Sequence, residues 1–78
     1  LTQTSVDTRI IFNAALNCLA TSILISHNHP SGRLEPSKAD INITERIKKG
    51  CEILDIRLID HIIITEADYY SFADNNII

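Results

Sequence analysis

The spacing of apolar positions predicts two helices. Residues 8 to 20 place their apolar side chains at helical spacing, and Ser5 or Asp7 is suited to cap this helix. Its expected inward face consists of Ile11, Ala14, Ala15 and Cys18. A second helix is predicted after Ser37, a good N-cap residue, with an inward stripe made of Asp40, Ile43, Ile47, Cys51 and Leu54.

Three further segments follow the pattern of strands, whereas residues 1 to 6 are expected to form a lead-in or a strand end. Residues 22 to 26 predict a buried strand that runs straight into His27. Residues 56 to 65 are apolar on both alternations, which predicts a central strand covered on both faces. Residues 69 to 72 predict a short antiparallel partner or an edge strand.

The order of these elements is helix, strand, helix, strand, strand, which defines the fold class as α/β, with helices flanking a small mixed sheet. The loop from residue 28 to residue 36 holds two prolines and Gly32, which tolerates a positive φ. We find no linker or internal repeat, and 78 residues amount to one domain at most.

Composition and charge narrow the function classes. Apolar residues make up 45% and charged residues 22% of the chain, a globular balance, and the net charge of −3 gives no electrostatic support for nucleic-acid binding. Cys18 and Cys51 lie in apolar stretches without ligand-like spacing, which indicates buried free thiols and a cytoplasmic location. Apolar runs fall short of the ~20 residues that span a bilayer.

The candidate chemistry lies in residues 26 to 40, SHNHPSGRLEPSKAD. His27 and His29 are two positions apart at the end of an extended segment, so their side chains point the same way. Asp40 belongs to the inward stripe of the second helix, where an unpaired carboxylate is costly. Two histidines, one carboxylate and an open fourth position form the ligand pattern of catalytic zinc, and iron or nickel accepts similar ligands.

A simpler interpretation of the same stretch competes with the metal site. Ser37-x-x-Asp40 resembles a capping box, although that motif prefers Glu or Gln in its last position. Spacing alone leaves both interpretations open, and the inward position of Asp40 favours the metal. His61 shares its alternation face with Ile59 and Ile63, which indicates a hydrogen-bonded core histidine rather than a ligand.

The motif His27-x-His29-Pro30 followed by Ser37-x-x-Asp40 resembles the metal motif of the JAB1/MPN (JAMM) metalloenzymes. The strings HNHPSGRLEPSKAD, LDIRLIDHIIIT and YYSF resemble the RadC branch of that family over nearly the whole chain. The resemblance implies a cytidine deaminase-like fold and one zinc ion held by His27, His29 and Asp40. It also implies that Ser37 acts in catalysis, by positioning a substrate carbonyl or stabilising its oxyanion.

The family's general base is a glutamate upstream of the histidines, and here the sequence departs from the pattern. Residues 1 to 26 contain no glutamate, and their one acid, Asp7, suits a helix cap. Either the branch has lost this base, or the glutamate precedes Leu1. Because the chain begins abruptly, we expect residues 1–78 to be the C-terminal part of a RadC-like domain that is incomplete at its N-terminus.

Two functions are expected from these features. The first is a zinc-dependent hydrolase of peptide or protein substrates, and phosphodiester cleavage uses similar zinc chemistry. The second is a non-catalytic module that binds protein or DNA, with a structural or vestigial metal site. The RadC branch carries a DNA-repair name whose basis is unsettled. An open sheet edge also predicts homo-oligomers.

Overall fold

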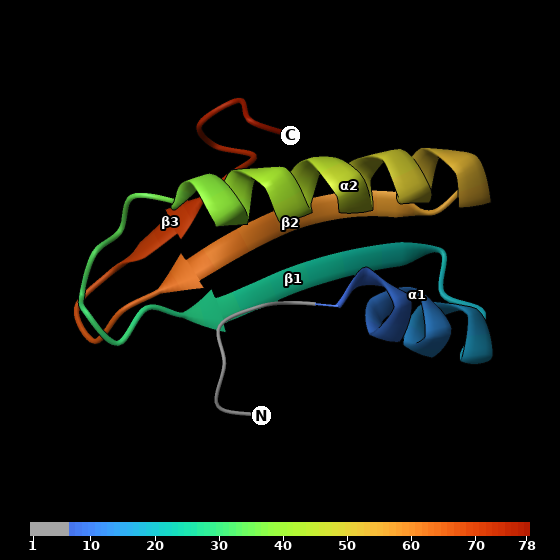
Figure 1. Ribbon diagram of the computed structural model, residues 1–78, viewed down its shortest axis with the longest axis horizontal. Coiled ribbons are helices and arrows are strands. Elements are labelled where there is room, and N and C mark those ends of the chain that lie inside the picture. Colours follow the sequence, from blue (N-terminus) through green and yellow to red (C-terminus); the bar gives the residue numbers. More distant parts are fainter. Residues whose placement is uncertain (1–6) are drawn as a thin grey trace.

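The computed structural model describes residues 7–78, so the predicted lead-in at residues 1–6 and the alternative cap Ser5 lie outside the described residues. The elements follow the predicted order (Figure 1). They are helix α1 (Thr8–Asn17), strand β1 (Ser22–Asn28), helix α2 (Lys38–Leu54), strand β2 (Arg57–Ile64) and strand β3 (Tyr69–Ser71). The α/β class is therefore confirmed.

The sheet is mixed, as predicted, with the strand order β1-β2-β3. Strands β1 and β2 are parallel, and their register runs from Ser22 beside Arg57 to Asn28 beside Ile64. Strand β3 pairs antiparallel to β2. Because the two parallel strands end together, Asn28 and Ile64 bring the segments that follow them to the same edge of the sheet.

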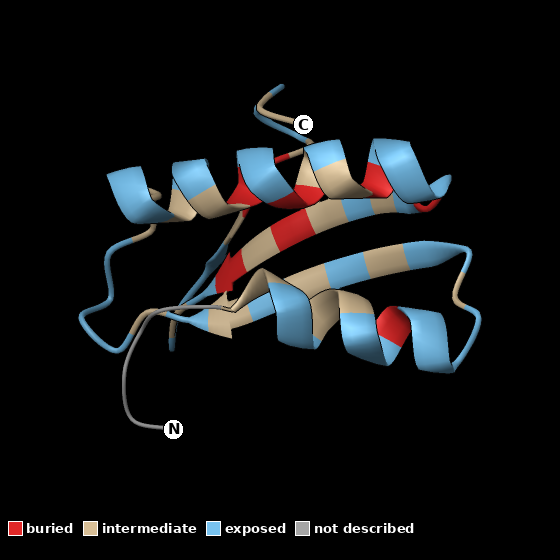
Figure 2. Cartoon of the chain, turned by 45° about the vertical axis from the view of Figure 1, so that its right-hand side comes forward, coloured by how far each residue is buried: buried red, intermediate tan, exposed pale blue. Residues whose placement is uncertain are grey.

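Both helices pack against one face of this sheet. The buried core residues are Ala15 of α1, Ile47 and Cys51 of α2, and Ile56 at the entry to β2. Partly buried apolar side chains of β1 and β2 pack against the same cluster, namely Ile23, Ile25 and Leu58. Figure 2 shows the buried positions concentrated where α2 faces β2, with one in α1. Among residues 7–78, no helix is long and apolar enough to cross a membrane.

Much of the opposite face of the sheet is exposed within the described residues, and two predictions about the strands are wrong for this reason. Strand β1 was expected to be buried, but exposed and half-buried residues alternate along it, and Leu24 is 58% exposed. Strand β2 was expected to be covered on both faces, but Ile59 and Ile64 are exposed. Apolar residues on both alternations do not by themselves show that a second layer exists.

A β-bulge also interrupts the predicted alternation in β2. Ile23 pairs with Leu58 and the next residue, Leu24, pairs with Asp60, so Ile59 is the extra residue. His61 and Ile63 lie buried on the helix side, whereas Ile59 is exposed. The prediction that Ile59 shares their face is therefore wrong.

Helix α1 ends at Asn17, three residues before the predicted end. Leu19 has a positive φ of 53°, and the Ala20 N–H donates to the Ala15 carbonyl, which closes the helix in a Schellman-type turn. The prediction that Cys18 is buried is therefore wrong, because it caps this exposed end, while Cys51 is buried as predicted. Ala14 is also exposed, contrary to expectation, because α1 contacts the core through a narrower face.

Helix α2 matches its predicted start at Ser37 and most of its inward stripe. Its last residue, Leu54, is 40% exposed rather than inward, because the helix stops there and Asp55 turns the chain with a φ of 57°. In the loop before α2, Gly32 has a φ of 81°, which confirms that this turn uses the conformational freedom of glycine.

Candidate metal centre

The candidate metal centre lies where the parallel strands end, a common position for sites in open α/β sheets. Strand β1 runs two residues beyond its predicted end, so His27 is its penultimate residue and His29 follows it directly. The His29 N–H donates to the Ile64 carbonyl, which continues the pairing with β2 past the strand end. The two imidazoles lie on the same side, as predicted, with their ring centroids 4.7 Å apart.

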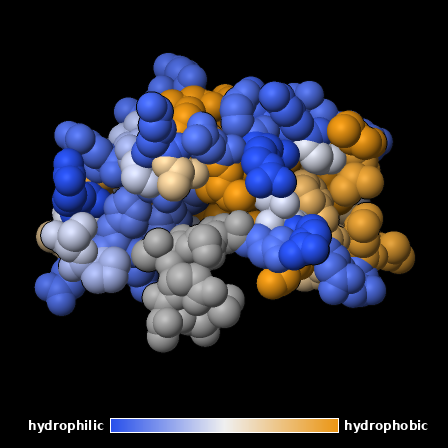
Figure 3. Space-filling model, in the orientation of Figure 1, coloured by the Kyte–Doolittle hydropathy of each residue, from blue (hydrophilic) through white to orange (hydrophobic). Residues whose placement is uncertain are grey.

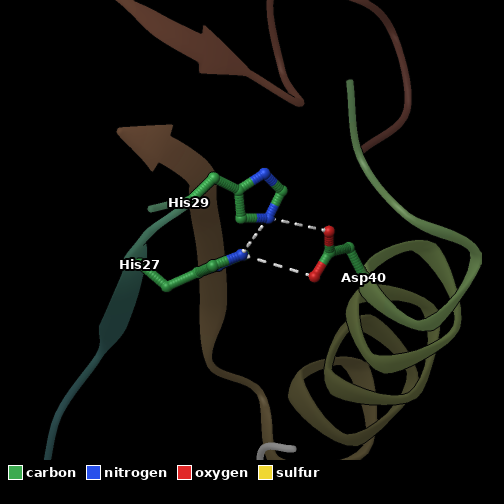
Figure 4. Close-up of side chains that lie close together, drawn as sticks. All are labelled: His27, His29 and Asp40. Atoms are coloured by element: carbon green, nitrogen blue, oxygen red, sulfur yellow. Dashed lines mark hydrogen bonds and ion pairs between the residues drawn. The ribbon is translucent and has the colours of Figure 1, made fainter. Parts of the chain in front are cut away.

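His27, His29 and Asp40 meet in one cluster (Figure 4). The two Nε2 atoms lie 2.9 Å apart. Nε2 of His27 lies 3.3 Å from Oδ1 of Asp40, and Nε2 of His29 lies 3.2 Å from Oδ2. Each residue thus offers one ligand atom, and these atoms lie within 4.8 Å of one another.

Helix α2 positions the carboxylate through its first turn. The Asp40 N–H donates to Ser37 Oγ at 3.1 Å, and the Ser37 N–H donates to Asp40 Oδ2 at 2.8 Å, which completes a capping box. Ser37 is therefore the N-cap, as predicted, and Asp40 is both a capping residue and a member of the histidine cluster. The two interpretations of the sequence are compatible, because one carboxylate accepts from the cap and faces the imidazoles.

The loop that follows β1 orients His29. Its Nδ1 lies 2.8 Å from the Arg33 carbonyl oxygen. A carbonyl only accepts hydrogen bonds, so Nδ1 of His29 donates to it, and Nε2 is the ring nitrogen that faces Asp40.

His61 lies behind His27, and only 1% of it is exposed. Its Nε2 lies 2.9 Å from Nδ1 of His27, and its Nδ1 lies 2.6 Å from Oγ1 of Thr44. His61 is thus a hydrogen-bonded core histidine, as predicted. Sequence reasoning missed Thr44, although it stands four residues after Asp40 and so lies on the same side of α2.

The surroundings shift pKa values in this cluster so that His27 and His61 favour their neutral forms and Asp40 favours its ionised form. Burial lowers the pKa of His27, against the attraction of Asp40, and burial lowers the pKa of His61 to about 4. Burial opposes the ionisation of Asp40, but the contacts with Ser37 and the two histidines hold its pKa below the usual value. A neutral imidazole and an ionised carboxylate are the forms that bind metals.

Within residues 7–78 this cluster contains no glutamate. The first glutamate of the sequence is Glu35, which is exposed in the loop. Asp7 is the N-cap of α1, as expected, and accepts a hydrogen bond from the Arg9 N–H at 2.9 Å. Beside His29 a surface hollow of about 690 Å³ opens between the segments after β1 and β2, and Glu66 is part of its lining.

A mixed α/β fold with two histidines at a strand end and one aspartate at a helix start is of the JAB/MPN type. Residues 1–77 match the RadC-like JAB domain family, and the chain belongs to this family. The resemblance seen in the motifs is thereby confirmed.

Three relatives are named UPF0758 proteins. The one from Flavobacterium johnsoniae is 53% identical over 74 residues, which cover 95% of this chain and 32% of that protein. The one from Streptococcus suis is 47% identical over 70 residues, which cover 90% of this chain and 28% of that protein. The one from Porphyromonas gingivalis is 43% identical over 79 residues, which cover 100% of this chain and 35% of that protein. The chain thus spans about a third of the length of these curated relatives.

Proposed function

We propose that His27, His29 and Asp40 bind one zinc ion in a hydrolase site. The observation that carries the proposal is the convergence of two imidazole nitrogens and one carboxylate within 2.9 to 3.3 Å of one another. Two ligands bound tetrahedrally to zinc at about 2.0–2.1 Å lie about 3.3 Å apart, so the donor set suits zinc in both chemistry and spacing. Three ligands leave one position for a substrate or water, as in catalytic sites.

Zinc in such a site would lower the pKa of a bound water and polarise a carbonyl or phosphoryl oxygen. Family membership favours a peptide or isopeptide bond as the target. Asp40 and the two histidines hold the ion. Ser37 lies on the adjacent turn and is exposed, and within residues 7–78 its hydroxyl accepts from Asp40 and donates to no other residue. We assign it the role of donating to the substrate oxygen as negative charge develops there.

The hollow beside His29 offers space for the substrate. We propose a peptide or protein as the substrate, because an extended peptide fits along a strand edge and the net charge of −3 does not favour nucleic acid.

We also propose a cytoplasmic location, because the two free cysteines suit a reducing compartment.

A second function is favoured by one specific observation, the lack of a glutamate in the cluster within residues 7–78. Loss of a general base typically slows a reaction by about 10²–10⁴-fold. Under this second proposal the chain binds a protein or DNA partner, with the metal in a structural role.

Hydrolysis assays separate these two functions. The full-length Flavobacterium johnsoniae relative and this chain are each loaded with zinc or stripped with a chelator, then incubated with internally quenched peptides and, separately, with plasmid DNA. We expect zinc-dependent peptide cleavage by the relative, and slower cleavage by this chain, by about 10²–10⁴-fold. Zinc-loaded protein that cleaves neither substrate, yet shifts DNA in a salt-dependent way, contradicts the hydrolase and favours the binding module.

A further inference from the structure

A chain of hydrogen bonds connects helix α2 to His27 through two residues outside the ligand set. The Thr44 hydroxyl donates to the Asp40 carbonyl at 2.7 Å, and the same oxygen lies 2.6 Å from Nδ1 of His61. Nε2 of His61 lies 2.9 Å from Nδ1 of His27. The helix that carries Asp40 is thus also linked, through His61, to Nδ1 of His27.

The direction of each hydrogen bond follows from its partners. The Asp40 carbonyl only accepts, so it takes the single hydroxyl proton of Thr44, and Oγ1 of Thr44 must accept from Nδ1 of His61. His61 is 1% exposed, and a neutral imidazole has one ring proton. With that proton on Nδ1, Nε2 of His61 is an acceptor, so Nδ1 of His27 must donate.

The consequence for His27 is a fixed tautomer. With its proton on Nδ1, neutral His27 has its free lone pair on Nε2, the atom that faces Asp40 and His29 (Figure 4). The opposite tautomer would place a proton on Nε2, where a metal would otherwise bind.

Packing fixes the plane of the His61 ring as well. The ring stacks on Phe72 with centroids 4.4 Å apart and an interplanar angle of 10°. Phe72 is 0% exposed, so the pair is held in the interior. Since ring nitrogens direct their lone pairs in the ring plane, the stack aims Nε2 of His61 at His27.

We propose that Thr44 and His61 are positioning residues that hold His27 in the tautomer and orientation required of a metal ligand. This inference rests on the proposed metal site, and assigns those two residues a role beyond the three ligands. Partners that orient a ligating histidine typically contribute 10- to 100-fold to metal affinity.

The first test reads the tautomers directly, with no metal present. Long-range ¹H–¹⁵N spectra of the chelator-treated chain at pH 8 report which ring nitrogen of each histidine carries the proton, with assignments from single-histidine variants. We expect the proton of His27 on Nδ1, and we expect T44V to lose this signature. A proton on Nε2 of His27 in the unsubstituted chain overturns the inference, whether or not T44V folds.

The second test measures zinc affinity by competition with a chromophoric chelator. T44V removes the hydroxyl while keeping the shape of the side chain, T44S keeps the hydroxyl, and I47V removes one buried methylene a turn away as a control for lost stability. We expect T44V to weaken zinc binding 10- to 100-fold, and T44S and I47V to stay within about threefold of the unsubstituted chain.

The outcomes separate this inference from the proposed function. If the unsubstituted chain binds no zinc, the metal site and this role are both overturned. If it binds zinc while T44V matches I47V in affinity, the positioning role alone is overturned and the metal site stands.

Discussion

At the scale of single residues, Asp40 serves local structure and candidate chemistry with the same carboxylate. Oδ2 accepts the Ser37 N–H and faces His29, while Oδ1 faces His27. A negative charge in the first turn of a helix is also favoured by the helix dipole. This double role explains why the spacing Ser37-x-x-Asp40 alone could not separate a helix cap from a metal ligand.

His61 predicts how the stability of the metal-free chain depends on pH. Its folded pKa of about 4 lies below the ordinary 6.5, so the unfolded chain binds more protons between these values. The contribution of neutral His61 to the free energy of unfolding is fully present above pH 6.5 and is lost as the pH falls towards 4. Each pKa unit corresponds to about 1.36 kcal/mol, so the loss is on the order of 3 kcal/mol.

Urea unfolding with chelator present, at a series of pH values from 7.5 to about 4.5, measures this loss. His61→Gln serves as the comparison, because an amide hydrogen-bonds without titrating in this range. We expect the variant to show a smaller decrease in unfolding free energy. Equal pH dependence in both proteins would contradict the assignment to His61.

At the scale of elements, the contact between α1 and α2 depends on Gly50. A Cβ placed at Gly50 would lie 2.5 Å from Cζ and 2.7 Å from Cε2 of Phe12, so the ring must move before any side chain fits. Replacing glycine by alanine within a helix ordinarily gains about 1 kcal/mol. We expect Gly50→Ala to lower the unfolding free energy instead, because the displaced ring loses its packing against α2.

A double-mutant cycle with Phe12→Leu checks this explanation of Gly50. The smaller side chain leaves room for the new methyl group, so Gly50→Ala should become neutral or stabilising in that background. Chemical denaturation of the four proteins gives the coupling energy, expected in the range of about 0.5–3 kcal/mol for residues in contact. Additive effects would show that Phe12 does not oppose the substitution.

The sequence predicted the order and type of every described element, because the two helices have a helical period and the strands are short apolar runs bounded by turn residues. The residues of the candidate metal site were also identifiable, since His27 and His29 lie at the end of a strand and Asp40 lies at the start of a helix. Which faces are covered could not be predicted, since Leu24 and other exposed apolar residues follow the same pattern as buried ones. The contacts of Thr44 with His61 depend on how α2 packs on β2, which no local pattern specifies.

At the scale of the whole molecule, we propose that the outer edge of β1 pairs with a second copy of the chain. The Thr21 carbonyl and the His29 N–H both bond to β2, and alternate residues of a parallel strand face opposite edges. The even-numbered residues between them, including Ser26, therefore direct their N–H groups to the outer edge. Among residues 7–78 the sheet ends at β1, which leaves these groups available for strand pairing.

Light scattering over a concentration series tests this proposal, which predicts a dimer that Ser26→Pro disrupts. A competing surface lies at the right-hand end of Figure 3, where apolar side chains gather around the C-terminal ends of the helices. Ile53→Lys tests this competing surface, because Ile53 is 83% exposed on α2. A monomer at all concentrations, or a dimer lost only in Ile53→Lys, would contradict pairing through β1.

The zinc content of the purified chain tests the proposed metal site. Elemental analysis after purification without chelator compares the unsubstituted chain with Asp40→Asn, which keeps an acceptor for the Ser37 N–H but loses the charge, and with Ser37→Ala. The last variant weakens the helix cap by about 1 kcal/mol and keeps all three ligands. We predict about one zinc per chain in the unsubstituted protein and in Ser37→Ala, and almost none in Asp40→Asn. A folded chain that contains no zinc and takes up none on addition would contradict the account.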